Sequence, residues 1–183
     1  MATLPIVRLG HPALRTAARP LDPSQLGSEG IQNLIDDMIE TMRSAGGVGI
    51  AAPQLGVELQ VFVYEAGDGE GSGIPLTVAV NPLVTPQQGE LVYDWEGCLS
   101  IPDLRGLVPR HPAVKLSGLD RQGRPFERTA ADFEARIIQH ENDHLNGIVF
   151  LDRMRDLKSL AYLPERERYW LAEEGEPEDE TVG

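Results

Sequence analysis

Residues 139–147 read QHENDHLNG, and this stretch holds the side chains best placed for chemistry in the chain. His140 and His144 are four residues apart, so on a helix they lie on the same face about one turn from each other. Glu141 follows the first histidine directly and completes the pattern HExxH. In that pattern the two imidazoles bind a metal ion and the glutamate transfers protons. Such a match also arises by coincidence, so the remaining ligands decide between the two interpretations.

A third ligand is needed, because a catalytic metal site typically has three protein ligands and one position for water. No histidine follows His144, and His11 and His111 each precede a proline, where a turn or surface position is expected. Cys98, in DWEGCLSIP, is the only cysteine. A lone cysteine is most often a small buried hydrophobe. A thiolate with two imidazoles is nevertheless a credible ligand set for zinc or ferrous iron.

Composition limits the class of protein. A length of 183 residues with 41% hydrophobic and 25% charged residues is typical of one soluble domain. The formal net charge of −13, without basic and aromatic residues interleaved, argues against sequence-specific contact with nucleic acid. A single cysteine excludes an internal disulfide. No long apolar run or leader pattern is present, so we expect no membrane segment and a cytoplasmic location.

The spacing of apolar residues predicts the elements that must position these groups. Residues 31–42 have helical periodicity, with Gly46 as the stop. Strands are expected at 59–65, 77–80, 89–95 and 113–120, with a hairpin turn at 121–124. A second helix is expected at about 130–146, capped by Thr129 and Asp132 and ended by Gly147. A weaker helix at 156–171 is interrupted by Pro164. These elements predict an α+β fold, with antiparallel strands packed around a central HExxH helix.

Three segments together resemble the signature motifs of the peptide deformylase family. They are GVGIAAPQ at 47–54, EGCLS at 96–100 and QHENDH at 139–144. The resemblance covers about residues 4–165 and implies the α+β deformylase fold. It also implies removal of the formyl group, as formate, from N-formylmethionine at the start of newly made polypeptides.

The resemblance assigns roles to individual residues. It implies that Cys98, His140 and His144 bind one divalent metal ion, most commonly Fe²⁺ in this family, with Zn²⁺, Ni²⁺ or Co²⁺ also able to occupy the site. Glu141 takes a proton from water and delivers it to the departing amine. The Gln54 side-chain amide and the Leu99 N–H are the implied donors to the oxyanion.

Residues around the metal are expected to hold an N-formylmethionyl peptide. Gly49 would let the peptide pair with the main chain beside the metal. The methionine side chain is expected to fill an apolar slot lined by Val48, Trp95, Phe133 and Ile137. Arg105 matches a family position that contacts the substrate backbone, although a surface charge is an alternative. We also expect two acids near the motifs, Glu96 and Asp143, to orient a ligand or to pair with Arg110.

Residues 1–165 are expected to form a single catalytic domain, followed at 166–183 by an acidic and partly disordered tail. Family members often have a basic C-terminal helix associated with docking at the ribosome, and a transient ribosome contact of this acidic sequence would need a different docking mode. Two rival interpretations remain at this point. One is a metallopeptidase acting on another amide, and the other is a protein with a structural metal site.

Overall fold

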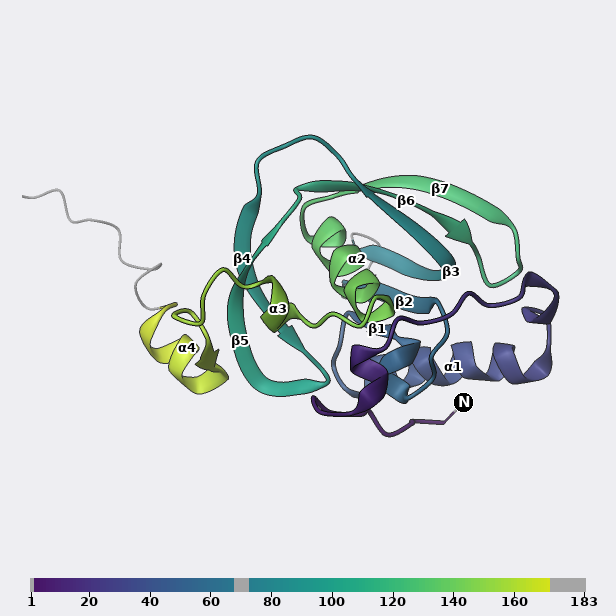
Figure 1. The fold of residues 1–183 in the computed structure, drawn as a ribbon, viewed down its shortest axis with the longest axis horizontal. Helices are drawn as coiled ribbons and strands as arrows, with labels where there is room; N and C mark the ends of the chain where they lie inside the picture. Colours follow the sequence, from purple (N-terminus) through teal and green to yellow (C-terminus); the bar gives the residue numbers. More distant parts are fainter. Residues whose placement is uncertain (1, 68–72, 172–183) are drawn as a thin grey trace, which may run out of the picture.

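The computed structural model describes residues 2–67 and 73–171 and has an α+β architecture (Figure 1). Within this part of the chain, β1, β2, β3, β6 and β7 form one antiparallel sheet in that order, and β4, β5 and β8 form a second. The elements are η1 Pro12–Arg15, η2 Pro23–Gln25, α1 Glu29–Ser44, β1 Gly49–Ala51, η3 Ala52–Leu55, β2 Val61–Ala66, β3 Ile74–Pro86, β4 Val92–Cys98, β5 Ile101–Arg110, β6 Ala113–Leu119, β7 Pro125–Ala131, α2 Asp132–Leu145, α3 Phe150–Arg153, β8 Ala161–Tyr162 and α4 Leu163–Tyr169.

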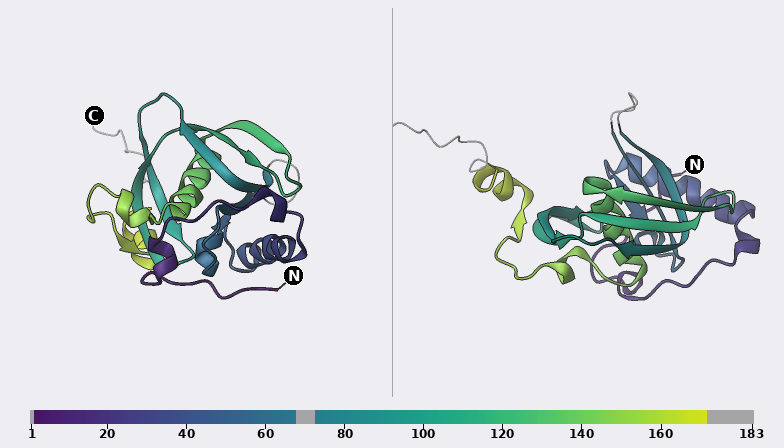
Figure 2. Two further views of the ribbon diagram at one scale, coloured as in Figure 1. Left: turned by 45° about the vertical axis from the view of Figure 1, so that its right-hand side comes forward. Right: turned by 90° about the horizontal axis from the view of Figure 1, so that it is seen from above.

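Successive side chains of β2 point to opposite faces of the larger sheet, and a different helix packs against each face. Val61 and Val63 belong to the apolar cluster that includes α1, whereas Phe62 and Tyr64 belong to the cluster that includes α2. Both faces of this sheet are therefore covered. Figures 1 and 2 show α2 in the middle of the molecule, with the larger sheet on one side and the β4–β5 hairpin on the other.

The β4–β5 hairpin brings the cysteine motif against α2. Its strands pair from Val92↔Arg110 to Glu96↔Gly106, and the register then shifts before Cys98↔Ile101. A bulge of this kind bends a strand and redirects its side chains. The shift falls directly beside the cysteine, at the end of the hairpin that faces the HExxH helix.

Most predicted elements are present, but several boundaries are wrong. The first helix, the strand at 59–65 and the turn at 121–124 are confirmed, the last by Asp120 N–H to Arg124 O at 2.9 Å. The strand expected at 77–80 is part of the longer β3, and the one at 89–95 starts at Val92 and runs to Cys98. No strand was predicted at β5 or β7, and each forms by antiparallel pairing with the strand before it, β5 with β4 and β7 with β6.

The start of the HExxH helix is a further correction. Thr129 and Ala130 lie in β7, paired with Lys115 and Val114 of β6, so Thr129 does not cap the helix. Helix α2 begins at Asp132, and no side chain caps it. The hydrogen bonds of the β6–β7 ladder take the backbone that a longer helix would need. The other end agrees with the prediction, because Gly147 has φ +71° and donates its N–H to His144 O at 3.2 Å.

The helix in the C-terminal segment, α4, is shorter than the helix predicted at 156–171. Pro164 lies in the first turn of α4, directly after Leu163, where a missing N–H costs nothing, so it does not interrupt the helix. Arg166 and Arg168, which the sequence placed in the tail, therefore lie in α4. The disorder predicted for the tail concerns residues 172–183, which are outside those described.

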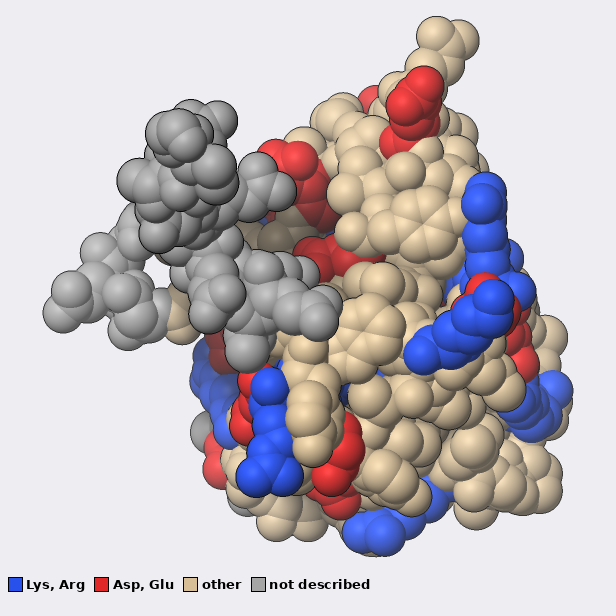
Figure 3. All heavy atoms as spheres, turned by 90° about the vertical axis from the view of Figure 1, so that its left-hand side faces the viewer, with Lys and Arg blue, Asp and Glu red and all other residues tan. Residues whose placement is uncertain are grey.

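Acidic and basic side chains are interspersed on the face of the molecule that carries α4 (Figure 3). Positive charge does not gather into one patch on the described part of this face. Among residues 2–67 and 73–171, the structure contains no helix with the length and apolar character needed to cross a membrane.

Candidate active site

The three predicted metal ligands come together between β4 and α2. The Sγ of Cys98 and one nitrogen each of His140 and His144 all lie within 4.8 Å of one another. Cys98 Sγ is 3.3 Å from His144 Nε2. The two histidines share one face of α2, as their spacing predicts, and their rings stand edge to face with centroids 5.1 Å apart. By contrast, His11 is exposed and caps η1, which agrees with its predicted turn position.

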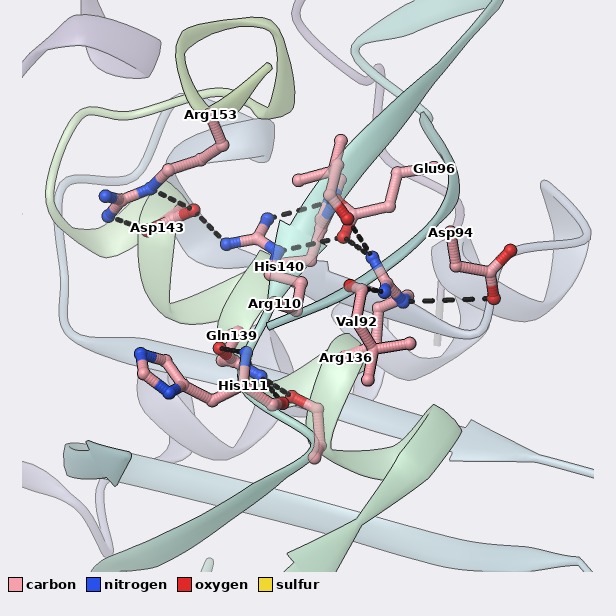
Figure 4. Close-up of polar contacts among 12 residues, drawn as sticks. Val92, Asp94, Glu96, Arg110, His111, Arg136, Gln139, His140, Asp143 and Arg153 are labelled. Atoms are coloured by element: carbon pink, nitrogen blue, oxygen red, sulfur yellow. Dashed lines mark hydrogen bonds and ion pairs between the residues drawn. The ribbon is translucent and has the colours of Figure 1, made fainter. Parts of the chain in front are cut away.

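A buried ion-pair network holds the first of these histidines (Figure 4). Glu96 Oε2 lies 2.9 Å from His140 Nδ1. Arg110 donates to both oxygens of Glu96, at 2.8 and 3.0 Å, and to Asp143 at 2.6 Å. Arg153 donates to the same aspartate at 2.6 Å. Glu96 and Asp143 thus pair with Arg110, as expected from their position beside the motifs.

The charge state of Glu96 determines which ring nitrogen of His140 is free to bind a metal ion. Burial by itself would raise the pKa of Glu96, but hydrogen bonds from His140 and Arg110 outweigh burial and hold that pKa well below its ordinary value. The carboxylate is therefore ionised and only accepts, so His140 Nδ1 must donate the hydrogen. Nε2 is left to face Cys98, which is the arrangement that outer carboxylates impose on metal-binding histidines.

Burial and neighbouring charge act differently on the two imidazoles. Burial lowers the pKa of His144 well below its ordinary value, which keeps this ring in the neutral form that binds metals. Burial would do the same to His140, but Cys98 and Glu96 raise its pKa well above the ordinary value. A metal ion must displace that proton, and binding is therefore coupled to proton release.

Arg136 is a member of this network that sequence reasoning missed. Its Nη1 donates to Glu96 Oε1 and to the carbonyl of Val108, both at 2.9 Å, and its Nη2 donates to the carbonyl of Val92 at 2.8 Å. Arg136 precedes His140 by four residues, so the two lie on the same face of α2. This four-residue spacing from His140 is the sequence signal that could have identified Arg136. Arg136 and Arg110 hold Glu96 from two sides (Figure 4).

Gln54 lies beside the thiol with its amide oriented by the main chain. The side-chain oxygen accepts the Ala51 N–H at 2.8 Å, which turns the NH₂ group toward the site. Nε2 is 3.6 Å from Cys98 Sγ and 3.4 Å from Ser100 Oγ. Gln54 is buried, at 1% exposure, so this orientation is fixed by its surroundings. The amide offers a preorganised donor next to the ligand cluster.

Glu141 is a buried carboxyl that the backbone of the glycine motif approaches closely. A Cβ on Gly49 would lie 2.5 Å from Glu141 Oε1, so any larger residue at this position would have to displace the carboxyl group. Glu141 Oε2 is buried and has no hydrogen-bond partner among the described residues. Burial raises the pKa of Glu141 to about 7. A carboxyl with that pKa is well suited to exchange protons near neutral pH.

A cavity of about 420 Å³ opens next to these groups. All of the predicted substrate-binding residues line it, together with Gln54, Cys98, Leu99, His140 and Glu141; the predicted set is Val48, Gly49, Trp95, Arg105, Phe133 and Ile137. Ile137 is buried at 4%, whereas Val48 and Phe133 are 39% and 52% exposed and so lie toward the opening. His144 is fully buried and does not line the cavity. Arg105 lies across Gly97, where any side chain would collide with the guanidinium.

The residues present fit a metal ion of the late first row. Thiolate and imidazole are soft or borderline ligands that favour iron, cobalt, nickel or zinc over magnesium or calcium. Three protein ligands leave coordination positions for water or substrate, which is typical of a catalytic site and not of a closed structural one. Glu141 lies one residue from a ligand, with an oxygen that lacks a protein partner. Fold and site together define a mononuclear metallohydrolase.

Comparison with known proteins narrows this class to one family. The family model described as polypeptide deformylase matches residues 3–160. Peptide deformylase 1 of Nitrosomonas europaea is 42% identical over 162 residues, covering 86% of this chain and 91% of the relative. Peptide deformylase 2 of Pseudomonas putida is 44% identical over 161 residues, covering 86% and 90%.

Solved structures give the same result. A Met-Ala-Ser-bound class I type b peptide deformylase from Acinetobacter baumannii has a TM-score of 0.79 at 38% identity, covering 84% of this chain and 99% of that one. An actinonin-bound peptide deformylase from Synechococcus elongatus has a TM-score of 0.76 at 38% identity, covering 85% and 81%. The chain therefore belongs to the polypeptide deformylase family. It is a metal-dependent hydrolase that removes the N-formyl group from nascent peptides.

Proposed function

We propose that the resident metal is Fe²⁺, held by Cys98, His140 and His144, and that Glu141 is the proton-transfer group of the reaction. The observation that carries this proposal is the convergence of one thiolate and two imidazoles on a single point beside a buried carboxyl. When bound, the metal supplies Lewis-acid activation of water and of the formyl carbonyl. Zn²⁺, Ni²⁺ and Co²⁺ suit the same ligands and are the alternatives.

Glu141 moves the proton that the reaction must relocate. A water oxygen forms a bond to the formyl carbon, and the C–N bond of the formamide breaks. Glu141 accepts the proton from that water and delivers it to the departing nitrogen, so the products are formate and a free amine. Its burial beside Gly49 excludes bulk water from the carboxylate and keeps it ready to accept a proton.

Gln54 and Leu99 are proposed to stabilise the negative charge that develops on the formyl oxygen. The Gln54 amide is held by Ala51 with its NH₂ group beside Cys98, which supports this role. Leu99 follows the thiolate residue directly, so its N–H lies one residue from a metal ligand. Preorganised donors of this kind act on charge that exists only in the transition state.

The substrate is proposed to be an N-formylmethionyl peptide whose side chain enters the cavity. Ile137, Phe133, Val48 and Trp95 supply the apolar walls, and a volume of about 420 Å³ is adequate for the methionine and its formyl group. Gly49 and Arg105 are proposed to hold the peptide main chain. The Met-Ala-Ser peptide in the Acinetobacter baumannii relative supports a peptide of this kind.

We also propose a cytoplasmic location and a transient encounter with the ribosome, where nascent N-termini emerge. No sequence-specific nucleic-acid contact is expected. The mixed charge of α4 (Glu165, Arg166, Glu167 and Arg168) does not supply the basic helix that would dock by charge alone. Co-sedimentation with ribosomes at low salt tests this encounter. Binding that vanishes when residues 172–183 are removed would assign docking to the tail.

The metal proposal is tested by purifying the protein without oxygen, measuring bound metals and following activity in air and under argon. We expect iron to predominate and activity to decay faster in air, since the thiolate and ferrous iron are both open to oxidation. Zn²⁺-loaded protein is the control and should decay at the same rate in both gases. Equal half-lives for the protein as purified would contradict an iron enzyme.

A further inference from the structure

Trp95 contacts both the cavity and the C-terminal segment of the chain. It lines the proposed methionine site. The ring of Trp170, at the end of α4, meets Trp95 edge to face, with centroids 5.4 Å apart and an interplanar angle of 74°. The Arg166 guanidinium carbon lies over the same indole, 4.8 Å from its centroid. Both are favourable arrangements for aromatic and cation–π contacts.

The burial of one Arg166 atom, its Nε, indicates that this contact is a packed one. Its Nε is buried and has no hydrogen-bond partner among the described residues. Burial removes the water that would hydrogen-bond to this nitrogen, and that loss is unfavourable unless another interaction offsets it. The cation–π contact with the indole face of Trp95 provides such an interaction. Arg166 therefore covers one face of the Trp95 indole without itself lining the cavity.

The same segment is joined to the second strand of the hairpin. In β8, Ala161 pairs with Arg105 and Tyr162 pairs with Leu104 of β5. The hydroxyl of Ser159 accepts the Leu107 N–H at 3.1 Å. In Figure 1, α4 and β8 lie on the outer side of the β4–β5 hairpin, away from α2. The segment thus supports both strands that carry cavity residues.

Apart from the Ser159 hydrogen bond, this support lies beyond the part of the chain that the family model matches. The match to the family model ends at residue 160, directly before β8. The ligands, Glu141 and Gln54 all precede that point. A family member could therefore keep the catalytic residues and change the outer wall of the methionine site through substitutions in residues 161–170.

We infer that residues 161–170 are a specificity-determining element, in which Arg166 and Trp170 are positioning residues that hold Trp95 in the wall of the methionine site. The inference rests on the proposed function, because it takes the cavity as the site for the methionine side chain. Loss of either contact releases the Trp95 ring, which enlarges the slot and weakens its contact with a long side chain. A short side chain, which does not reach the ring, is unaffected.

The test compares steady-state formate release from formyl-Met-Ala-Ser and formyl-Ala-Ala-Ser. For Trp170→Ala we expect KM for the methionine peptide to rise roughly three- to tenfold, the loss typical of one aromatic contact. The kcat should stay within about twofold, since no transition-state contact is removed. Trp170→Phe should restore KM because it keeps an aromatic edge, and Arg166→Gln should reproduce part of the rise. Tyr169→Ala, 59% exposed and on the same helix, is the matched control.

Fluorescence supplies a second measurement that does not depend on turnover. The chain has two tryptophans, so Trp170→Phe leaves Trp95 as the only one. We expect the emission of this variant to change on titration with Met-Ala-Ser, and the apparent Kd of Trp170→Ala to rise in step with its KM.

Two kinetic results would overturn the inference. One is a Trp170→Ala variant that matches Tyr169→Ala with both peptides, and the other is an equal rise in KM for the methionine and alanine peptides. A parent protein that releases no formate would contradict the proposed function instead. In that case the fluorescence titration tests the inference independently of turnover. A Trp95 emission that does not change on addition of Met-Ala-Ser would overturn the inference.

Discussion

Replacing Arg110 by methionine tests how much stability is lost when two buried carboxylates lose a shared partner. The side chains of Arg110, Glu96 and Asp143 are only 5%, 4% and 5% exposed. Arg110→Met keeps much of the volume but leaves two buried carboxylates with less compensation. Removing one partner of a buried ion pair costs about 3–5 kcal/mol.

The expected loss lies at the lower end of that range. Arg136 still donates to Glu96, and Arg153 still donates to Asp143, so neither carboxylate loses every partner. We therefore predict that Arg110→Met lowers the free energy of unfolding by about 3 kcal/mol. For a chain of this size, that corresponds to a fall in Tm of roughly 6–12 °C.

Urea unfolding of the metal-free protein is the assay, because bound metal would add its own stabilisation. Arg153→Met is the matched comparison, since this arginine bonds to the same aspartate but is 45% exposed; a loss of about 1 kcal/mol or less is expected. Lys115→Met, in an exposed pair with Glu127, should change stability by less than about 0.5 kcal/mol. An Arg110→Met variant no less stable than Arg153→Met would refute the reasoning.

Three further predictions concern the residues beside the metal. Gln54→Ala should lower kcat about 100- to 1,000-fold with metal content unchanged, and an unchanged kcat would remove Gln54 from the reaction. Gly49→Ala should cost about 1–3 kcal/mol of stability and most of the activity, because its methyl group would displace the Glu141 carboxylate. Gly27→Ala, with nothing within 4 Å of the added Cβ, is its control in the same urea titration. Activity of the metal-loaded protein should fall as the pH drops through the pKa of Glu141, which is about 7 in the metal-free structure and lower beside a cation. A pH–rate profile of Glu141→Gln with the same acid limb would assign that limb to another group.

The meeting of the two histidines was predictable because helix geometry fixes it. Residues four apart share a face wherever the helix lies, so His140, His144 and the adjoining Glu141 depend on local structure alone. Cys98 was different. No local rule joins a residue of β4 to α2, and its assignment as a ligand came from the absence of other candidates and from the family motifs.

The missed features depend on contacts between distant parts of the chain. Strand β5 contains Pro102 and Pro109, which weaken any strand pattern, and it forms because β4 pairs with it along one edge. Phe133 follows the apolar stripe of α2 but is 52% exposed at the cavity opening, since no element covers that turn among the described residues. The edge-to-face contact of Trp170 with Trp95 joins residues 75 positions apart and has no signal in either local sequence.

The central claim is that Glu141 moves the proton in a metal-dependent removal of formate. The most direct test measures formate released from formyl-Met-Ala-Ser by the protein purified without oxygen, beside Glu141→Gln with its metal content determined. We predict rapid release by the parent, a loss of about 100-fold or more in the variant at equal metal content, and no cleavage of unformylated Met-Ala-Ser by either. Full activity of Glu141→Gln, or cleavage of the unformylated peptide by the parent, would contradict the account.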